Sequence, residues 1–262
     1  MMPLDTRFLT LLRSAAKDVD WTEERTSSFS RLFDLLLASD ARANVTALKD
    51  PLDVVLKHFV DSLSLLKLPQ VKKILEEGGE VCDVGCGGGF PGLPVAIVCE
   101  KTPLTMIDST EKKIRLLSEN ASLLGLSNVR PLCGRGEELS KPGSEYREKF
   151  DLVFSRAVAN LPVLTELCLP FVKPGGLFVA MKGARAPEEV EASRRAVGQL
   201  GGAGMDCMPV HFEADLSVLT ENEIPSAREF LSAKRYLVVI RKEKSTRDQF
   251  PRSWAQMTKK PL

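Results

Sequence analysis

A glycine-rich loop that follows an acid is the segment of this chain with the clearest capacity to bind a small molecule. The letters DVGCGGGFPG cover residues 83–92, and Gly87, Gly89 and Gly92 have the G-x-G-x-x-G spacing of a dinucleotide-binding loop. Glycines let a ligand approach the backbone closely, because a Cβ would hold it away, and they adopt positive φ. Asp83, directly before the loop, would repel a pyrophosphate. The loop therefore predicts a nucleotide-like ligand and leaves its identity open.

The residues after the loop favour S-adenosylmethionine over a dinucleotide. A pyrophosphate needs free N–H groups at the start of the following helix, and Pro91 and Pro94 in FPGLP each remove one. S-adenosylmethionine has no phosphate, and its sulfonium and protonated amine suit the nearby Asp83. Asp108, at the end of the expected strand PLTMID, can accept both ribose hydroxyls of either ligand. Methyl transfer is therefore favoured, and a dinucleotide-dependent oxidoreductase remains the alternative.

The elements around the loop predict a doubly wound α/β sheet. Residues 1–70 show helical spacing of apolar positions, whereas from Glu80 onward short apolar runs alternate with helix-like segments. Two last runs, MPVHFEA and RYLVVIRK, have no helical pattern between them and predict an antiparallel hairpin. We expect a helical extension over 1–70, a main domain over 71–245, and a C-terminal tail over 246–262 packed on that domain or trailing from it. Ligands of such sheets bind at the carboxyl ends of the strands.

Composition restricts the remaining possibilities. The chain has 262 residues, of which 44% are hydrophobic, and its net charge is only +1, but residues 241–262 carry seven basic and two acidic side chains. A basic end fits an anionic partner. Six cysteines without a C-x-x-C pair, together with only two histidines, argue against a metal site and for reduced thiols. With neither a long apolar stretch nor a signal-peptide pattern, we expect a cytoplasmic protein with no membrane partner.

Several segments together resemble the GidB/RsmG family of ribosomal RNA methyltransferases. They are NVTALKDPLDVVLKHFVDSLSLL, DVGCGGGFPGLPVAI, MIDSTEKKIRLLSENASLLGLSNV, GRGEEL, FSRAVANLPVLTELCLPFVKPGG, MKG and the ending YLVVIRKEKSTRDQFPR with KKPL. The resemblance covers most of residues 40–262, and the first 40 residues match less closely. It implies a class I S-adenosylmethionine-dependent methyltransferase, with a Rossmann-like, mostly parallel seven-stranded sheet that ends in an antiparallel hairpin and an N-terminal helical extension.

The resemblance also implies a reaction and a partner. The family methylates N7 of one guanine in the 530-loop region of 16S ribosomal RNA, so we expect 16S rRNA or a small ribosomal subunit precursor as partner and a monomeric enzyme. N7 of guanine has a lone pair and no proton to lose, which removes the need for a general base and leaves catalysis to positioning. A non-catalytic RNA-binding module that kept the fold is the third alternative.

The implied site residues follow the ends of the expected strands. The cofactor-binding residues implied by the resemblance are Gly85, Phe90, Asp108, Gly136, Glu137 and Arg156, and the expected catalytic residues are Arg156 and Lys182. The backbone near Gly136 and Glu137 would meet the adenine edge, with Phe90 packed nearby. Arg156 would orient either the cofactor carboxylate or the base, and the sequence does not decide between them. Lys182, in MKG, would contact RNA phosphate.

Two further groups of polar residues have less specific interpretations. Asn44 and Thr46 in NVTAL, with His58 and Asp61 in KHFVDS, precede the expected sheet. His58 and Asp61 are three residues apart, hence on one helical face, which could close over the cofactor.

The second group, Lys112, Lys113 and Arg115, follows Asp108 on an expected helix. These three side chains form either a solvated face or, with the basic tail, a patch that contacts phosphate.

Overall fold

A single seven-stranded sheet runs through the computed structural model, which describes residues 4–262. Its strand order is β3-β2-β1-β4-β5-β7-β6, and β7 is antiparallel to both of its neighbours while β1 to β5 run parallel. The strands are β1 (Val81–Val84), β2 (Leu104–Asp108), β3 (Val129–Cys133), β4 (Phe150–Arg156), β5 (Val172–Lys182), β6 (Gly202–Val210) and β7 (Arg235–Lys242). The expected mostly parallel, Rossmann-like sheet is confirmed.

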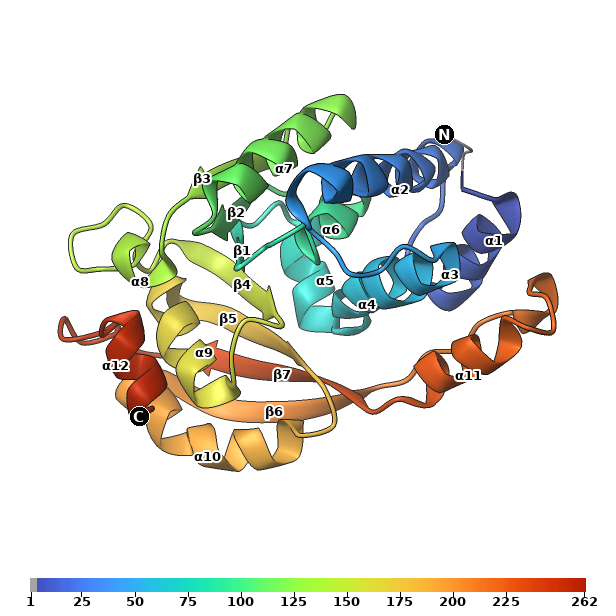
Figure 1. Ribbon diagram of the computed structural model, residues 1–262. Helices are drawn as coiled ribbons and strands as arrows, with labels where there is room; N and C mark the ends of the chain where they lie inside the picture. The colour runs from blue at the N-terminus through green and yellow to red at the C-terminus, as the bar shows by residue number, and fades with distance from the viewer. Residues whose placement is uncertain (1–3) are drawn as a thin grey trace.

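Helices cover both faces of this sheet (Figure 1). The α-helices after the N-terminal region are α6 (Gly92–Val98), α7 (Glu111–Leu123), α8 (Gly136–Leu139), α9 (Leu161–Cys168), α10 (Ala186–Gln199), α11 (Ile224–Ser232) and α12 (Trp254–Lys259), and short 3₁₀ turns occupy Leu169–Phe171 and Leu216–Val218. α6, α7 and the N-terminal helices cover one face, and α9, α10 and α12 cover the other. Along β5 the apolar side chains alternate between the two cores, because successive residues of a strand point to opposite faces.

The N-terminal region is helical as expected. It consists of α1 (Thr6–Ala15), α2 (Glu23–Ala43), a continuous helical stretch made of α3 (Pro51–Val54), η1 (Val55–Val60), α4 (Asp61–Leu63) and η2 (Ser64–Lys67), and finally α5 (Pro69–Glu76). η1 is a π-helical turn, a feature often found where a helix carries functional side chains. Phe29 and Phe59 are fully buried and pack edge to face in the core beneath these helices. This region therefore shares a core with the sheet rather than forming a separate body.

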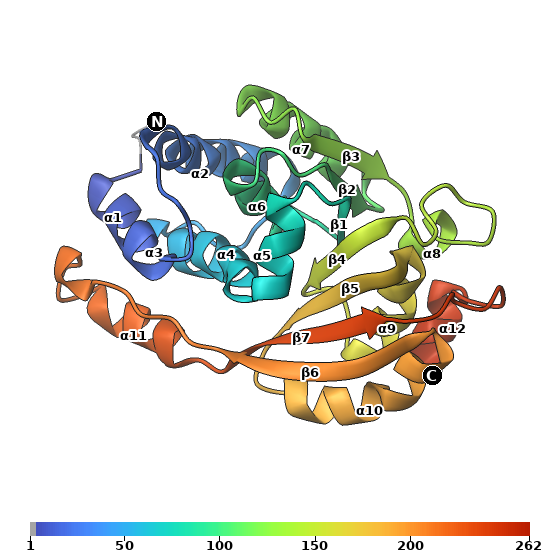
Figure 2. The ribbon, with the colours of Figure 1, turned by 180° about the vertical axis from the view of Figure 1, so that it is seen from behind.

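The expected antiparallel pair at the end of the sheet is confirmed, but the connection between its two strands contains a helix. The two strands do pair antiparallel, but a 3₁₀ turn and α11 lie between them in the chain and extend alongside α1 (Figure 2). Arg7 of α1 forms an ion pair with Glu223 at the start of α11. β6 also begins at Gly202, earlier than MPVHFEA. The expectation of no helix between the two runs is wrong: α11 has nine residues, and four of them, Ile224, Ala227, Phe230 and Leu231, belong to the core shared with the N-terminal helices.

The C-terminal segment packs on the main domain and is only partly a basic surface. Lys242 is 1% exposed, and its ammonium donates to the carbonyl of Leu169 and pairs with Glu148. Arg252 forms an ion pair with Glu166, a residue of α9 that is fully buried. Of the seven basic residues expected to face an anionic partner, Lys242 is therefore buried and the partly exposed Arg252 is engaged by a buried carboxylate. Across residues 4–262, no helix is both long enough and apolar enough to span a bilayer.

Candidate functional site

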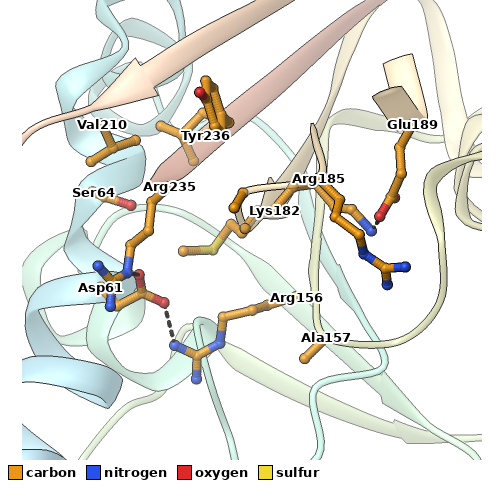
Figure 3. A pocket seen from close by; sticks show the side chains of 14 residues that line it. Asp61, Ser64, Arg156, Ala157, Lys182, Arg185, Glu189, Val210, Arg235 and Tyr236 are labelled. Atoms are coloured by element: carbon orange, nitrogen blue, oxygen red, sulfur yellow. Dashed lines mark hydrogen bonds and ion pairs between the residues drawn. The ribbon is translucent and has the colours of Figure 1, made fainter. Parts of the chain in front are cut away.

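Two adjoining cavities open at the carboxyl ends of the parallel strands. The first cavity, about 600 Å³, lies between the glycine loop 85–90 and the segments that follow β2, β3 and β4. The second cavity, about 560 Å³, lies between the end of β4, α4, and the adjoining parts of β5 and β7. Arg156 and Ala157 line both. The expected site at the carboxyl edge thus consists of two compartments with a shared wall, and Figure 3 shows the second of them.

The glycine loop has the backbone geometry that its residues require. Gly85, Gly87 and Gly89 all have positive φ, at 77°, 54° and 101°. Gly88 lies against the N-terminal region, since a Cβ placed on it would come within 2.8 Å of the carbonyl oxygen of Val45. The loop is consequently fixed between the sheet and the segment after α2, and its open side faces the first cavity.

Asp83 lies beneath the loop rather than at its mouth. Its side chain is 0% exposed, and one carboxylate oxygen accepts from the backbone N–H of Gly92 at 2.9 Å. The other oxygen has no hydrogen-bond partner within the described residues. Burial raises the pKa of Asp83 to about 7, although the Gly92 hydrogen bond acts in the opposite direction. The expectation that this carboxylate would face a bound ligand is therefore wrong, and its visible role is to hold the start of α6.

Asp108 occupies the expected position at the end of β2. Its side chain lines the first cavity, and its two oxygens accept from Gly87 N at 3.0 Å and Thr110 N at 2.8 Å. These hydrogen bonds fix the plane of the carboxylate, and each oxygen keeps a lone pair for another donor. A fixed carboxylate with two available acceptors suits the neighbouring hydroxyls of a ribose.

Gly136 and Glu137 begin α8 directly after β3, and both line the first cavity. Among residues 4–262 neither of their backbone N–H groups has a hydrogen-bond acceptor. A Cβ on Gly136 would come within 2.9 Å of the Leu167 side chain, so the start of α8 is packed tightly on α9. The arrangement leaves two rigidly held backbone donors for the edge of a heterocycle.

A chain of contacts joins Arg156 to the N-terminal region. Its guanidinium donates to the carbonyl of Lys57 at 3.0 Å and to Nδ1 of His58 at 3.3 Å. Nε2 of His58 is 2.7 Å from the hydroxyl of Thr46, and the His58 ring stacks on Phe90 with centroids 4.3 Å apart. Since Nδ1 accepts from an arginine, the proton of the neutral ring is assigned to Nε2. One face of Phe90 is thus occupied by His58, which restricts how Phe90 can contact a ligand.

Asp61 stands between two arginines in the second cavity. Arg156 Nη1 is 2.8 Å and Arg235 Nε is 3.2 Å from its two oxygens. Figure 3 shows the three side chains next to one another. His58, by contrast, lines the first cavity. The expectation that His58 and Asp61 would close over one ligand is corrected, because His58 lines the first cavity and Asp61 the second, although both contact the guanidinium of Arg156.

The neutral state of His58 predicts a specific loss of stability in acid. Burial, and secondarily the Arg156 cation, lower the pKa of His58 from 6.5 to about 3. Between pH 6.5 and pH 3, His58 is protonated in the unfolded chain but stays neutral in the folded protein. Its contribution to the free energy of unfolding is therefore complete above pH 6.5 and declines as the pH falls toward 3. Between about pH 7 and pH 5 we expect the free energy of unfolding, measured in urea, to fall about 2 kcal/mol less in His58→Gln than in the wild type. Parallel curves for the two proteins would contradict this assignment.

Lys182 lies in the second cavity but is held by protein groups. Its ammonium is 2.6 Å from a carboxylate oxygen of Glu189 and donates to the carbonyl of Ala159 at 2.9 Å. The side chain is 11% exposed. Contact between Lys182 and an RNA phosphate therefore stays a prediction, and it requires the ion pair with Glu189 to open. In the structure, the hydrogen bond from Lys182 to Ala159 fixes the loop after β4.

The three basic residues that follow Asp108 do not share one surface in the structure. Lys113 is half-buried and lines the first cavity, whereas Lys112 and Arg115 are exposed on α7, where Arg115 pairs with Glu111 at 3.6 Å. Within residues 4–262, no group of three or more His, Cys, Asp or Glu side chains is arranged to hold a metal.

Sequence reasoning missed several residues of the two cavities, and four of them bear on the site's chemistry or geometry. They are Ala157, Arg235, Tyr236 and Trp254. Ala157 has φ of 58°, a left-handed conformation that costs a residue with a Cβ about 1 kcal/mol. The sequence carries no local sign of this strain, and the other three come from β7 and α12, which no motif linked to the glycine loop.

The sequence is similar throughout to one family of proteins. Residues 25–211 match the family model described as GidB, rRNA small subunit methyltransferase G. A ribosomal RNA small subunit methyltransferase G from Deinococcus deserti is 43% identical over 234 residues, covering 89% of this chain and 87% of its own. The protein of the same name from Clostridium novyi is 37% identical over 257 residues, covering 97% of both chains.

Solved structures with a similar fold are methyltransferases or bind a cofactor. An O-methyltransferase from Bacillus cereus, in complex with SAH, has a TM-score of 0.51 at 12% identity, covering 80% of this chain and 90% of that one. Cofactor-bound Rv0187 from MTB has a TM-score of 0.52 at 14% identity, covering 81% and 90%. These likenesses support the class I fold.

Proposed function

This chain belongs to the rRNA small subunit methyltransferase G family, and on that premise we propose that it methylates N7 of one guanine in the 530-loop region of 16S ribosomal RNA. Membership makes it an S-adenosylmethionine-dependent ribosomal RNA methyltransferase. The choice of guanine, of N7 and of the 530-loop region is our proposal. We also propose that the enzyme acts as a monomer on 16S rRNA or on a small subunit precursor.

The residues of the first cavity fit S-adenosylmethionine. Asp108 presents a fixed carboxylate for a ribose, and Gly136 and Glu137 present backbone donors for an adenine edge. Pro91 caps α6, so the helix start that would hold a pyrophosphate lacks that N–H, and the N–H of Gly92 is already bonded to Asp83. These two facts disfavour the oxidoreductase alternative, which requires a diphosphate at this position.

The shared wall between the two cavities is the observation that carries the proposal. A methyl transferase must hold its cofactor and an acceptor base side by side, and Arg156 and Ala157 line both compartments. The second cavity has an aromatic surface from the half-buried Tyr236 and polar groups from Asp61 and Arg235. Proteins hold single unpaired RNA bases by such combinations of stacking and hydrogen bonds.

The proposed acceptor atom requires no general base. S-adenosylmethionine supplies an electrophilic methyl group on a sulfonium, and N7 of guanine offers a lone pair without a proton to remove. His58 is neutral and bonded at both ring nitrogens, so it is occupied in positioning Arg156. The task left to the protein is alignment, which can contribute roughly 7–11 kcal/mol to lowering the barrier in the best oriented reactions.

The proposal is tested by mapping methylated nucleotides in 16S rRNA from cells that lack this protein. Mass spectrometry should show one guanine in the 530-loop region without its N7 methyl group, and the wild-type protein should restore it. A missing methyl group at another atom or another nucleotide would contradict the finer proposal. No missing methyl group at all, with no transfer to small subunits from these cells in vitro, would favour the non-catalytic RNA-binding alternative.

A further inference from the structure

An aromatic side chain from the C-terminal helix forms part of the first cavity. Trp254, the first residue of α12, lines that cavity about 100 residues beyond β4, the last strand that contributes to it. The indole is half-buried and packs against the core formed with α9. Among residues 4–262 its ring nitrogen has no hydrogen-bond acceptor, whereas that of Trp21 donates to Ala16 O at 3.0 Å. Trp254 therefore contributes an aromatic side chain to the cavity wall.

The chain around Trp254 is anchored, so that this placement is built into the fold. Arg252 reaches Glu166 with its backbone N–H and its guanidinium, at 2.6–3.2 Å, and Glu166 is 0% exposed. Met257, one turn after Trp254, is also 0% exposed. Ser253 and Gln256 form a reciprocal capping box at the start of α12. These contacts hold the helix against α9, as Figure 1 shows.

The position of Trp254 identifies which part of a ligand it would meet. Asp108 ends β2, and Gly136 and Glu137 follow the edge strand β3, so a nucleoside with its ribose at Asp108 would extend its base toward the start of α8. α9 contacts both the start of α8 and α12: its Leu167 packs against Gly136, and α12 packs on the same helix. The start of α8 and α12 both pack on α9, which puts Trp254 on the same side of the first cavity as Gly136 and Glu137.

We propose that Trp254 is a cofactor-binding residue against which the adenine ring of S-adenosylmethionine packs, which makes the C-terminal segment a wall of the cofactor site. This inference rests on S-adenosylmethionine being the cofactor of the first cavity. The segment 246–262 then contributes to cofactor affinity as well as to the basic surface of the molecule.

Tryptophan emission tests the inference directly, because the chain has only two tryptophans. In Trp21→Phe, Trp254 is the sole tryptophan, and S-adenosylhomocysteine should change its emission with a midpoint equal to the Kd from calorimetry. Adenosine should cause the same kind of change, and methionine should not. Trp254→Ala should weaken S-adenosylhomocysteine binding about tenfold, in the lower part of the range for base–aromatic stacking, and Trp254→Phe should restore most of the affinity.

Two controls separate this inference from the cofactor assignment. Lys259→Ala with Lys260→Ala changes exposed residues of the same segment and should leave S-adenosylhomocysteine affinity unchanged. If the wild type binds S-adenosylhomocysteine while Trp254 emission stays constant and Trp254→Ala binds equally well, the inference is overturned and the cofactor assignment stands. If the wild type does not bind S-adenosylhomocysteine, both are overturned.

Discussion

Arg156→Ala is expected to lower kcat/KM for methylation of small ribosomal subunits about 100- to 1000-fold, a larger effect than on S-adenosylhomocysteine affinity. The guanidinium holds Asp61, His58 and the carbonyl of Lys57 at once, so it fixes the N-terminal region against the end of β4. Its removal takes away the larger of the two side chains that line both cavities. A displacement of about 1 Å between reacting groups costs on the order of 100-fold in rate.

Arg156→Lys and Arg25→Ala are the controls for this variant. Lysine keeps the charge but lacks the planar fork that reaches three acceptors, so its rate should lie between those of the wild type and the alanine variant. Arg25 also bonds a backbone carbonyl, that of Asp20, but it lines neither cavity, and its loss should leave kcat/KM within about twofold. The assignment of Arg156 fails if the alanine variant folds, by thermal unfolding and circular dichroism, and retains methylation within about threefold of wild type.

Local patterns were sufficient to predict most of the fold. The alternation of apolar runs and helical segments after Glu80 predicted a parallel sheet, and the glycine loop and Asp108 were placed correctly at its carboxyl edge. Each of these inferences depends on neighbours in sequence: a strand, its following turn, and the next helix. Their agreement is what makes the sheet predictable from one chain.

Contacts distant in sequence set the limits of that prediction. In the sequence, Asp83 is an acid next to a ligand-binding loop. Its side chain nevertheless lies inside the protein, because its orientation depends on the buried packing of β1 and on the hydrogen bond from the N–H of Gly92. Arg156 could not be assigned partners, because Asp61 and His58 are almost 100 residues away. The same holds for Trp254, which enters the first cavity from the end of the chain.

Asp108→Ala is expected to weaken S-adenosylhomocysteine binding about 100-fold. The change removes the acceptor for two ribose hydroxyls, and hydrogen bonds to charged groups are each worth roughly 1.5–3 kcal/mol. It also releases Gly87 N and Thr110 N, which lets the glycine loop and the start of α7 relax. Asp108→Asn keeps one amide oxygen and should lose about tenfold, since neutral hydrogen bonds are weaker than charged ones. Calorimetry with S-adenosylhomocysteine measures both.

Asp151→Ala distinguishes loss of the ribose acceptor from general loosening of the sheet. Asp151 also accepts a hydrogen bond from a loop backbone, Glu80 N at 2.9 Å, but it lies at the amino end of β4, opposite the first cavity. Its removal should lower the free energy of unfolding by about 1–3 kcal/mol without changing S-adenosylhomocysteine affinity by more than about twofold. If instead Asp108→Ala and Asp151→Ala weaken binding equally, Asp108 acts through stability alone. If the two variants have similar thermal stability and only Asp108→Ala loses affinity for S-adenosylhomocysteine, the Asp108 carboxylate binds the cofactor directly.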